Sequence, residues 1–340
     1  MKNKGRAIIG ICLCIAASAV FAGCGKKSGG NSSTVSTVKL ETGEIKDSSV
    51  VIKVGDTGVQ YSEICNYVYL LKKQYNKSFG SELWKYNLGD STIGDMAKEE
   101  IVNMVTQLKV IRSTAEEQDI ALTTDEKDQA IQQAEEIVYN AGEKAKEKYC
   151  LTVQNLTGIF EDNILANKMF YVATDEVDTD ISDEEAKQIS IQYMEIVTNG
   201  TDSNGTVISM DDAAKKKALA RIKKLRKSAK QSGDFLSIAQ ENTDSDSCEL
   251  TMGRETDKLP SEVVNMAFEL KKGELSDIIE TSEGYFVVYC VSDYDEDATY
   301  SRKEEIIEEN QTSMFKDKYA EWLKKCNVSI SKSFWNTFRI

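Results

Sequence analysis

Three stretches between Gly233 and Tyr289 decide the fold of this chain: GDFLSIAQENTDSD (233–246), LPSEVVNMAFELKKGELS (259–276) and ETSEGYFVVY (280–289). The first predicts the start of a helix at Gly233-Asp-Phe235. The second holds the pair of blocks Ala267-Phe268-Glu-Leu270 and Gly273-Glu-Leu-Ser276, and the third reads as a turn followed by a strand. Together they predict a small domain that mixes helices and strands.

The segment upstream of these blocks adds a strand and a strongly basic helix. Residues 190–197 (SIQYMEIV) alternate well enough to predict a half-buried strand. A polar loop follows, and then a helix is expected from about Asp211 to Lys230, with a narrow apolar face and a dense row of lysines and arginines. The basic row is interpreted either as a patch that attracts acidic clients or wall polymers, or as a solvated helix face, which we favour.

The order of these blocks, over residues ~189–293, resembles a parvulin-type peptidyl-prolyl isomerase domain. The resemblance implies an antiparallel four-stranded sheet plus helices. Parvulins usually place two histidines beside the bound proline, yet this chain contains no histidine. The resemblance puts Met194 and Phe286 at the two histidine positions. It implies catalytic positions at Ser245, Met194 and Phe286, and substrate-binding positions at Leu259, Val263 and Thr281.

Because the two histidines are missing, binding of a proline-containing peptide and catalysis of its isomerisation have to be considered separately. Rotation about an X–Pro bond must overcome a barrier of ~18–20 kcal/mol and needs no covalent chemistry. An apolar cup of Met194, Leu259, Val263 and Phe286 is expected to hold a proline ring, with Ser245 and Thr281 as the remaining donors. We therefore expect low or absent turnover and residual binding of extended apolar peptide. The alternatives are a prolyl isomerase of the foldase type and a purely binding chaperone (holdase).

The first half of the chain predicts a helical domain. Val50-Val-Ile-Lys-Val54 reads as a strand, followed by a Gly-containing turn and a helix, and this unit resembles the start of the chaperone domain in SurA-type and PrsA-type folding factors. Helical patterns follow at 93–118, 125–148 and 153–173. Because this half is nearly all helical, a solute-binding lipoprotein built from two α/β lobes is a poor alternative.

The last segment, residues 299–340, is rich in aromatic side chains at helical spacing. Leaving so much apolar surface exposed would be costly, so we expect it to pack back onto the first domain instead of forming a free partner-binding helix. The predicted fold class is α+β: a mostly helical SurA-like chaperone domain, built from N- and C-terminal segments, with an inserted parvulin-like domain. The predicted domains are 49–183, 184–298 and 299–340.

The N-terminus predicts a lipid anchor. A basic start precedes the apolar run Ala7–Ala22, which ends in Phe21-Ala22-Gly23-Cys24 and resembles a bacterial lipobox. Residues 1–24 are therefore expected to be a lipoprotein signal peptide, with Cys24 as the lipidated residue, and residues 25–48 a flexible tether. The alternative is an ordinary secretory signal. The predicted location is the extracytoplasmic face of the cell membrane, with unfolded or partly folded secreted proteins as partners.

The composition of the chain argues against several other classes of function. The formal net charge is −14 and would become about −17 without the signal peptide, which argues against a nucleic-acid partner. We expect no cofactor and no metal, because histidine is absent and the acidic run 293–297 lacks the spacing of a calcium loop. Of the eight cysteines, two lie in the predicted signal peptide before Cys24 and five lie after Cys24, and for these five we favour isolated, mostly buried thiols over a disulfide framework. The sequence leaves open whether the chain forms a homodimer.

Overall fold

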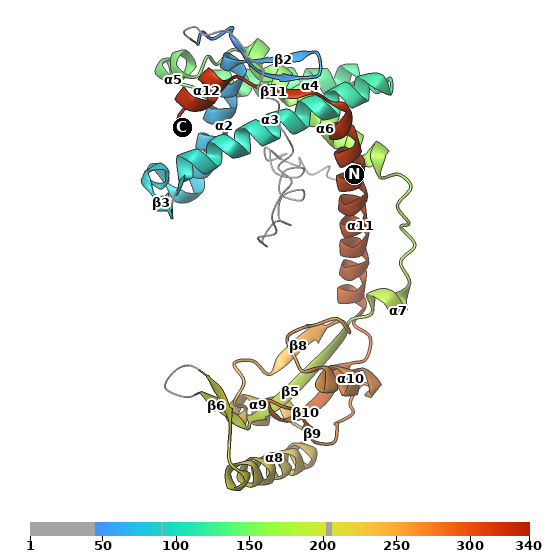
Figure 1. Cartoon of the computed structure of the whole chain (residues 1–340). Coiled ribbons are helices and arrows are strands. Elements are labelled where there is room, and N and C mark those ends of the chain that lie inside the picture. Colours follow the sequence, from blue (N-terminus) through green and yellow to red (C-terminus); the bar gives the residue numbers. More distant parts are fainter. Residues whose placement is uncertain (1–44, 90, 202–205) are drawn as a thin grey trace. The chain divides into compact units, whose positions relative to one another are not determined.

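The computed structural model describes residues 45–89, 91–201 and 206–340 (Figure 1). The predicted signal peptide, Cys24 and residues 25–44 of the predicted tether lie outside the described residues. The chain divides into two compact units. We call residues up to Val177 together with Gln311–Ile340 the helical unit, and Asp178–Asn310 the sheet unit. Within the described ranges, no helix combines the length and apolar character needed to cross a bilayer.

The helical unit contains a small sheet to which both ends of the described chain contribute. Strand β11 pairs antiparallel with β1, with Ile330 opposite Ile52, and β1 pairs with β2. The expectation that the C-terminal segment packs back onto the first domain is thereby confirmed. The elements of this unit are β1 (Val50–Val54), β2 (Thr57–Gln60), α2 (Tyr61–Phe79), η1 (Ser81–Lys85), β3 (Asn87–Leu88), β4 (Ser91–Thr92), α3 (Ile93–Glu117), α4 (Thr124–Asn140), α5 (Glu143–Lys148), α6 (Val153–Ala173), the C-terminal part of α11 (Glu296–Lys325), β11 (Val328–Ile330) and α12 (Lys332–Thr337).

One apolar core holds this unit together. The buried stripe of α3 packs with residues of α2, α6 and the sheet, and Phe315, Tyr319 and Trp322 of α11 join the same cluster. Burying one such aromatic side chain stabilises a fold by roughly 1.5–3 kcal/mol, which explains why the C-terminal helix docks. Phe315 makes edge or tilted contacts with the rings of Phe170 and Trp322.

One predicted helix is two helices in the structure. Thr123 caps α4 in a capping box with Glu126, but the helix expected over 125–148 ends at Asn140. Ala141 and Gly142 both have extended backbone angles, and Gly142 is the N-cap of α5. The expectation of one continuous helix is wrong because the periodicity continues across a local break, where Ala141 and Gly142 leave the helical conformation.

The sheet unit is a four-stranded antiparallel sheet with helices on both faces. The strand order is β8-β5-β10-β9 (Figure 1). Helices α8 and α9 contribute to the core on one face, and α10 contributes to the core on the other. The predicted four-stranded sheet with helices is confirmed. Its elements are α7 (Asp183–Ala186), β5 (Ile189–Val197), β6 (Asn199–Thr201), β7 (Val207–Ser209), α8 (Asp212–Ser232), α9 (Phe235–Asn242), β8 (Glu249–Met252), α10 (Ser261–Glu269), β9 (Ile279–Glu280) and β10 (Gly284–Ser292), with the first part of α11.

The boundaries between the units lie near, but not at, the predicted positions. The chain leaves the helical unit after Val177 and re-enters it at Gln311, whereas the sequence suggested changes after residues 183 and 298. Helix α11 runs without a break through the second of these positions. Its early residue Ile306 packs with Ile181 and Ala186, so the start of α11 belongs to the sheet unit.

Candidate functional site

Three of the four residues predicted to hold the proline ring lie on the face of the sheet that α10 covers. Leu259, Val263 and Phe286 belong to one buried cluster, and we call these three residues the apolar cup. Leu259 precedes α10, Val263 lies in the first turn of α10, and Phe286 is the third residue of β10. The structure therefore brings together three of the predicted site residues, from two elements far apart in the sequence.

Met194 does not belong to this cup, and the prediction that it lines the cup is wrong. Its side chain is buried in the opposite core, with Val287 and residues of α8 and α9. The register pairs Val287 with Met194 and Phe286 with Glu195. Because side chains alternate along a strand, a shift of one residue moves a side chain to the other face. The correct register brings Tyr193 to the cup face instead.

Tyr193 is the functional candidate that the sequence analysis missed. It belongs to the same buried cluster as the apolar cup, and its hydroxyl oxygen lies 3.3 Å from Oγ of Ser245. Either hydroxyl can be the donor. Strict alternation from Ile189 and Ile191 through Tyr193 was the signal in the sequence that could have found it. Tyr193 and Ser245 thus form a hydroxyl pair beside the apolar cup.

The loop that carries Ser245 is fixed to strand β5 by its preceding residues. Asp244 donates its backbone N–H to the carbonyl of Glu195, and its carboxylate accepts from the backbone N–H of Val197 at 3.1 Å. Arg221 of α8 donates to the same carboxylate at 2.8 Å and to the carbonyl of Asn242 at 2.6 Å. These contacts position Ser245, and they give one arginine of the basic helix a structural role.

The structure gives Thr281 a different role from the predicted one. Its hydroxyl donates to the carbonyl oxygen of Gly284 at 3.1 Å and accepts from the backbone N–H groups of Glu283 and Gly284. The single O–H proton is therefore used inside the turn between β9 and β10. Thr281 fastens this turn and has no proton left to donate to a substrate.

The apolar cup is nearly closed. Phe286 is 1% exposed, Val263 is 0% exposed and Leu259 is 8% exposed. Phenylalanine at position 286 fills space with an apolar ring and offers no hydrogen-bonding atom. A proline ring could enter only by displacing packed side chains, and interiors resist such displacement because they are densely packed. Any binding at the cup is therefore expected to be weak.

Glu195 places a carboxyl group on the cup face, as the cross-strand neighbour of Phe286. Partial burial raises the pKa of this carboxyl, and the nearby carboxylates of Glu283 and Asp244 raise it further. A carboxyl with a raised pKa binds its proton more tightly in the folded state than in the unfolded state. Its contribution to stability is complete below the ordinary pKa of 4.5 and is lost as the pH rises through the raised folded value.

We therefore expect Glu195→Gln to stabilise the sheet unit near pH 7.5 relative to the unsubstituted chain, and to leave its stability near pH 4 almost unchanged. The glutamine keeps the shape of the side chain and removes the charge that neighbouring carboxylates repel. Hydrogen exchange of the amides in β5 and β10 at the two pH values measures the effect. Equal protection of the two proteins at both pH values would contradict it.

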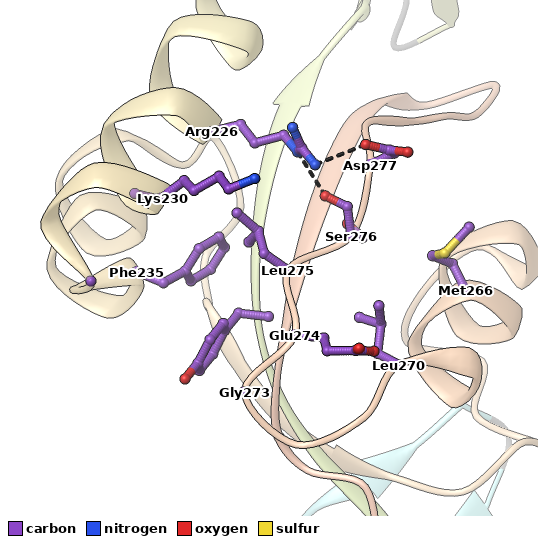
Figure 2. A pocket seen from close by; sticks show the side chains of 13 residues that line it. Arg226, Lys230, Phe235, Met266, Leu270, Gly273, Glu274, Leu275, Ser276 and Asp277 are labelled. Carbon is purple, nitrogen blue, oxygen red and sulfur yellow. Dashed lines mark hydrogen bonds and ion pairs between the residues drawn. The ribbon is translucent and has the colours of Figure 1, made fainter.

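One cavity of the sheet unit lies away from the predicted site residues. It has a volume of about 620 Å³ and is lined by side chains of α8, of α10 and of the segment before β9. Figure 2 shows Arg226 bridging this segment by hydrogen bonds to the carbonyl of Ser276 and the carboxylate of Asp277, at 2.7 and 2.8 Å. The stacked rings of Phe235 and Tyr289, 5.9 Å apart, form another part of the wall. Arg226 is therefore a second arginine of the basic helix with a structural role.

The described residues contain five free thiols and no grouped metal ligands. Among the described residues, no group of three or more histidine, cysteine, aspartate or glutamate side chains is placed to hold a metal ion. Cys65, Cys150, Cys248, Cys290 and Cys326 are free thiols, of which Cys65 and Cys290 are buried. The other three are half-buried.

Comparison with known proteins agrees with both units. A family model described as the PPIC-type peptidyl-prolyl isomerase (rotamase) domain matches residues 177–292, and one described as the SurA-like N-terminal domain matches residues 1–158. The chain thus joins a parvulin-type domain to a SurA-like domain. It belongs to the PrsA/SurA-type parvulin foldases.

Relatives of the same type match most or half of the chain. The foldase protein PrsA of Clostridium botulinum is 23% identical over 312 residues, which cover 85% of this chain and 90% of that protein. PrsA of Streptococcus mutans is 26% identical over 185 residues, 50% of this chain and 52% of that protein. The crystal structure of PrsA from Lactococcus lactis covers 85% of this chain and 97% of its own, with 18% identity and a TM-score of 0.35. PrsA from Bacillus subtilis gives 18% identity, coverage of 86% and 99%, and a TM-score of 0.25.

Proposed function

We propose that this chain is an extracytoplasmic protein-folding factor, held at the cell membrane by lipid on Cys24, that acts on unfolded or partly folded secreted proteins. The parvulin-type and SurA-like domains support the folding role. The apolar run before Phe21-Ala22-Gly23-Cys24 supports the anchor, and the acidic composition supports a domain that anionic headgroups repel. The proposal includes a weak prolyl isomerase activity of the sheet unit.

The hydroxyl pair beside the apolar cup is the observation that carries the activity. In the twisted state of an X–Pro bond, amide resonance is lost and the nitrogen gains a lone pair that can accept a hydrogen bond. Tyr193 and Ser245 each carry an O–H that can rotate towards such an atom, and the pair lies 3.3 Å apart in the same part of the domain as Leu259 and Phe286. Hydrogen bonds made only to the twisted amide would speed rotation without imidazole.

Removing either hydroxyl should therefore reduce the rate. We expect Tyr193→Phe and Ser245→Ala each to lower the catalysed part of the isomerisation rate by roughly tenfold, the equivalent of one hydrogen bond of ~1.4 kcal/mol. The rate is measured with the full chain on short Xaa-Pro peptides with varied Xaa. Because the hydroxyls act as a pair, the double variant should lose little more than either single variant.

Tyr139→Phe is the matched control, because Tyr139 is 87% exposed in the helical unit and the same oxygen atom is removed. Its rate should equal that of the unsubstituted chain. Unchanged rates in both Tyr193→Phe and Ser245→Ala, with measurable turnover in the parent, would place the activity elsewhere in the molecule.

The closed state of the apolar cup favours a second function, that of a holdase that binds clients without turnover. The helical unit offers a separate binding place for it: a cavity of about 500 Å³ lined by Val102, Ile330 and Trp335, with polar side chains around them. A client without proline separates the two functions. A holdase would suppress its aggregation as strongly as that of a proline-containing client, and no peptide isomerisation would be detected.

A further inference from the structure

The cavity of about 620 Å³ in the sheet unit combines apolar side chains with charged ones (Figure 2). Its volume falls within the ~300–1,000 Å³ of ordinary ligand pockets. The apolar and aromatic residues that line it are Ala229, Phe235, Met266, Leu270, Leu275 and Tyr289. The cavity can therefore take an apolar side chain of a ligand, and its charged groups decide which ligand this is.

One cation at this cavity has no partner. Arg226 and Asp277 neutralise each other at 2.8 Å, and the carboxylate of Glu274 accepts from the backbone N–H of Lys271 at 2.8 Å. Lys230 also lines the cavity, is exposed, and makes no ion pair or hydrogen bond with any described residue. Figure 2 shows Lys230 on the α8 side of the cavity and Glu274 beside Leu270. The carboxylate of a ligand is therefore expected on the α8 side.

Lys230 is the last member of a row of exposed lysines on α8. Lys223, Lys227 and Lys230 follow one another at steps of four and three residues, so they lie on one face of the helix, and we call these three residues the lysine row. None of them makes an ion pair with a described residue, whereas Arg221 and Arg226 of the same helix are both paired. The lysine row thus presents three free positive charges that start at the cavity and continue along α8.

The positive charge of α8 contrasts with the rest of the chain. The helix holds seven lysines, two arginines and one aspartate, while the net charge of the whole chain is −14. An acidic ligand is therefore attracted to this helix and repelled by much of the remaining surface. In an extended peptide, alternate side chains lie ~6.6–6.8 Å apart on the same side, close to the ~6 Å rise along the helix between Lys223 and Lys227. Carboxylates at alternate positions of a peptide can thus meet neighbouring lysines.

We propose that the cavity and the lysine row form a second peptide-binding site, separate from the apolar cup, which takes an acidic segment of an unfolded client. One apolar side chain of the segment enters the cavity, and carboxylates at alternate positions pair with the lysine row. A phosphate polymer or a layer of anionic headgroups would meet the lysines but has no side chain for the cavity, so the two features together favour a peptide. That the peptide belongs to an unfolded client rests on the folding role proposed above.

The test uses the full chain and a short fluorescein-labelled peptide without proline, in which one leucine is followed by glutamates at alternate positions and serines elsewhere. Binding is measured by fluorescence anisotropy at low ionic strength, and added salt should weaken it because the charges are exposed. Lys223→Gln, Lys227→Gln and Lys230→Gln combined should weaken binding by roughly tenfold, since each exposed ion pair contributes little by itself. Replacing the leucine of the peptide by serine should also weaken binding to the parent chain, because the cavity then loses its apolar occupant.

Lys258→Gln, Lys316→Gln and Lys324→Gln combined are the matched control, because these exposed lysines lie outside α8 and their removal lowers the net charge by the same amount. The control should bind the peptide as tightly as the parent does. Equal affinities of the lysine-row variant and the control would overturn the proposal. Equal affinities of the parent for the leucine and serine peptides would overturn it as well, because the cavity would then take no part.

Vesicles of phosphatidylglycerol and inorganic polyphosphate are tested in the same way. Binding of either one through the lysine row, without binding of the peptide, would also overturn the proposal. Isomerisation of an Xaa-Pro peptide is measured separately with the lysine-row variant, and its rate should equal that of the parent because the lysine row does not include the hydroxyl pair. Binding of the acidic peptide and isomerisation can therefore fail independently of each other.

Discussion

Asp162→Asn is expected to lower the free energy of unfolding of the helical unit by roughly 3–5 kcal/mol. The carboxylate of Asp162 is 1% exposed and lies between two cations. It accepts from Nζ of Lys109 at 2.7 Å and is paired with Nε of Arg112. Removing its charge leaves Arg112 and Lys109 partly buried with fewer negative partners, and an uncompensated buried charge costs several kcal/mol.

Tryptophan fluorescence during urea unfolding measures this change, because Trp84, Trp322 and Trp335 are the chain's three tryptophans and all lie in the helical unit. Glu161→Gln is the matched control. Glu161 is the neighbouring residue, its carboxylate lies 3.8 Å from the same Arg112, and both side chains there are 27% exposed. Its cost should stay below about 1 kcal/mol. Equal losses in the two variants would contradict the special role of Asp162.

Gly284→Ala should destabilise the sheet unit by about 3 kcal/mol, at the upper end of what overpacking usually costs. A Cβ atom at position 284 would lie 2.4 Å from the carbonyl oxygen of Ile196 and 2.9 Å from Cα of Val197. Both are backbone atoms of β5, so no side-chain rotation can relieve the contact. The first pair of the β5–β10 ladder must separate, which also disturbs the turn that Thr281 fastens.

The sheet unit holds no tryptophan, so hydrogen exchange of β5 and β10 amides is the suitable measurement. The tryptophan transition of the helical unit gives an internal reference, and it should be unchanged. Gly200→Ala is the matched control, because a Cβ atom there meets nothing within 4 Å in the same unit. If Gly284→Ala exchanged no faster than Gly200→Ala, the close approach of the two strands would be wrong.

Much of the architecture could be predicted because it follows from periodicity and burial. Apolar side chains recur at helical spacing in α3 and in the aromatic part of α11, and this pattern predicts both helices. The start of α4 could be predicted from the capping box that Thr123 forms with Glu126. The docking of the C-terminal segment onto the first domain, which the pairing of β11 with β1 completes, could be predicted from the cost of exposing aromatic side chains. In each case the decisive interaction involves residues near in sequence or a large apolar surface.

The site could be predicted only in part because it depends on register. Leu259, Val263 and Phe286 were predicted from the resemblance of their blocks to a parvulin-type domain, and the structure places them in one buried cluster. Met194 was placed one residue out because SIQYMEIV presents apolar side chains on both faces of a strand that is buried on both sides. Alternation therefore allows two assignments of faces for this strand. The series Ile189, Ile191 and Tyr193 is the right one, and the cross-strand partners place Tyr193 on the same face as Phe286.

The features that could not be predicted are contacts between segments far apart in the sequence. Neither the ion pair of Arg221 with Asp244 nor the hydrogen bond from Asn66 to the carbonyl of Cys150 leaves a local pattern in the sequence. The basic helix illustrates the difficulty, because arginines with structural partners and solvated lysines have the same sequence signature. Only the packing of α8 against the neighbouring loops separates them.

The proposed prolyl isomerase activity can be measured by exchange spectroscopy of an Xaa-Pro peptide, with the full chain at a small fraction of the peptide concentration. The same samples report the methyl signals of Leu259 and Val263 when the chain is isotopically labelled. We expect cis–trans exchange faster than the uncatalysed process, which takes tens of seconds at 25 °C, together with shifts of both methyl signals. Exchange at the uncatalysed rate, with the two methyl signals unmoved at saturating peptide, would contradict this expectation.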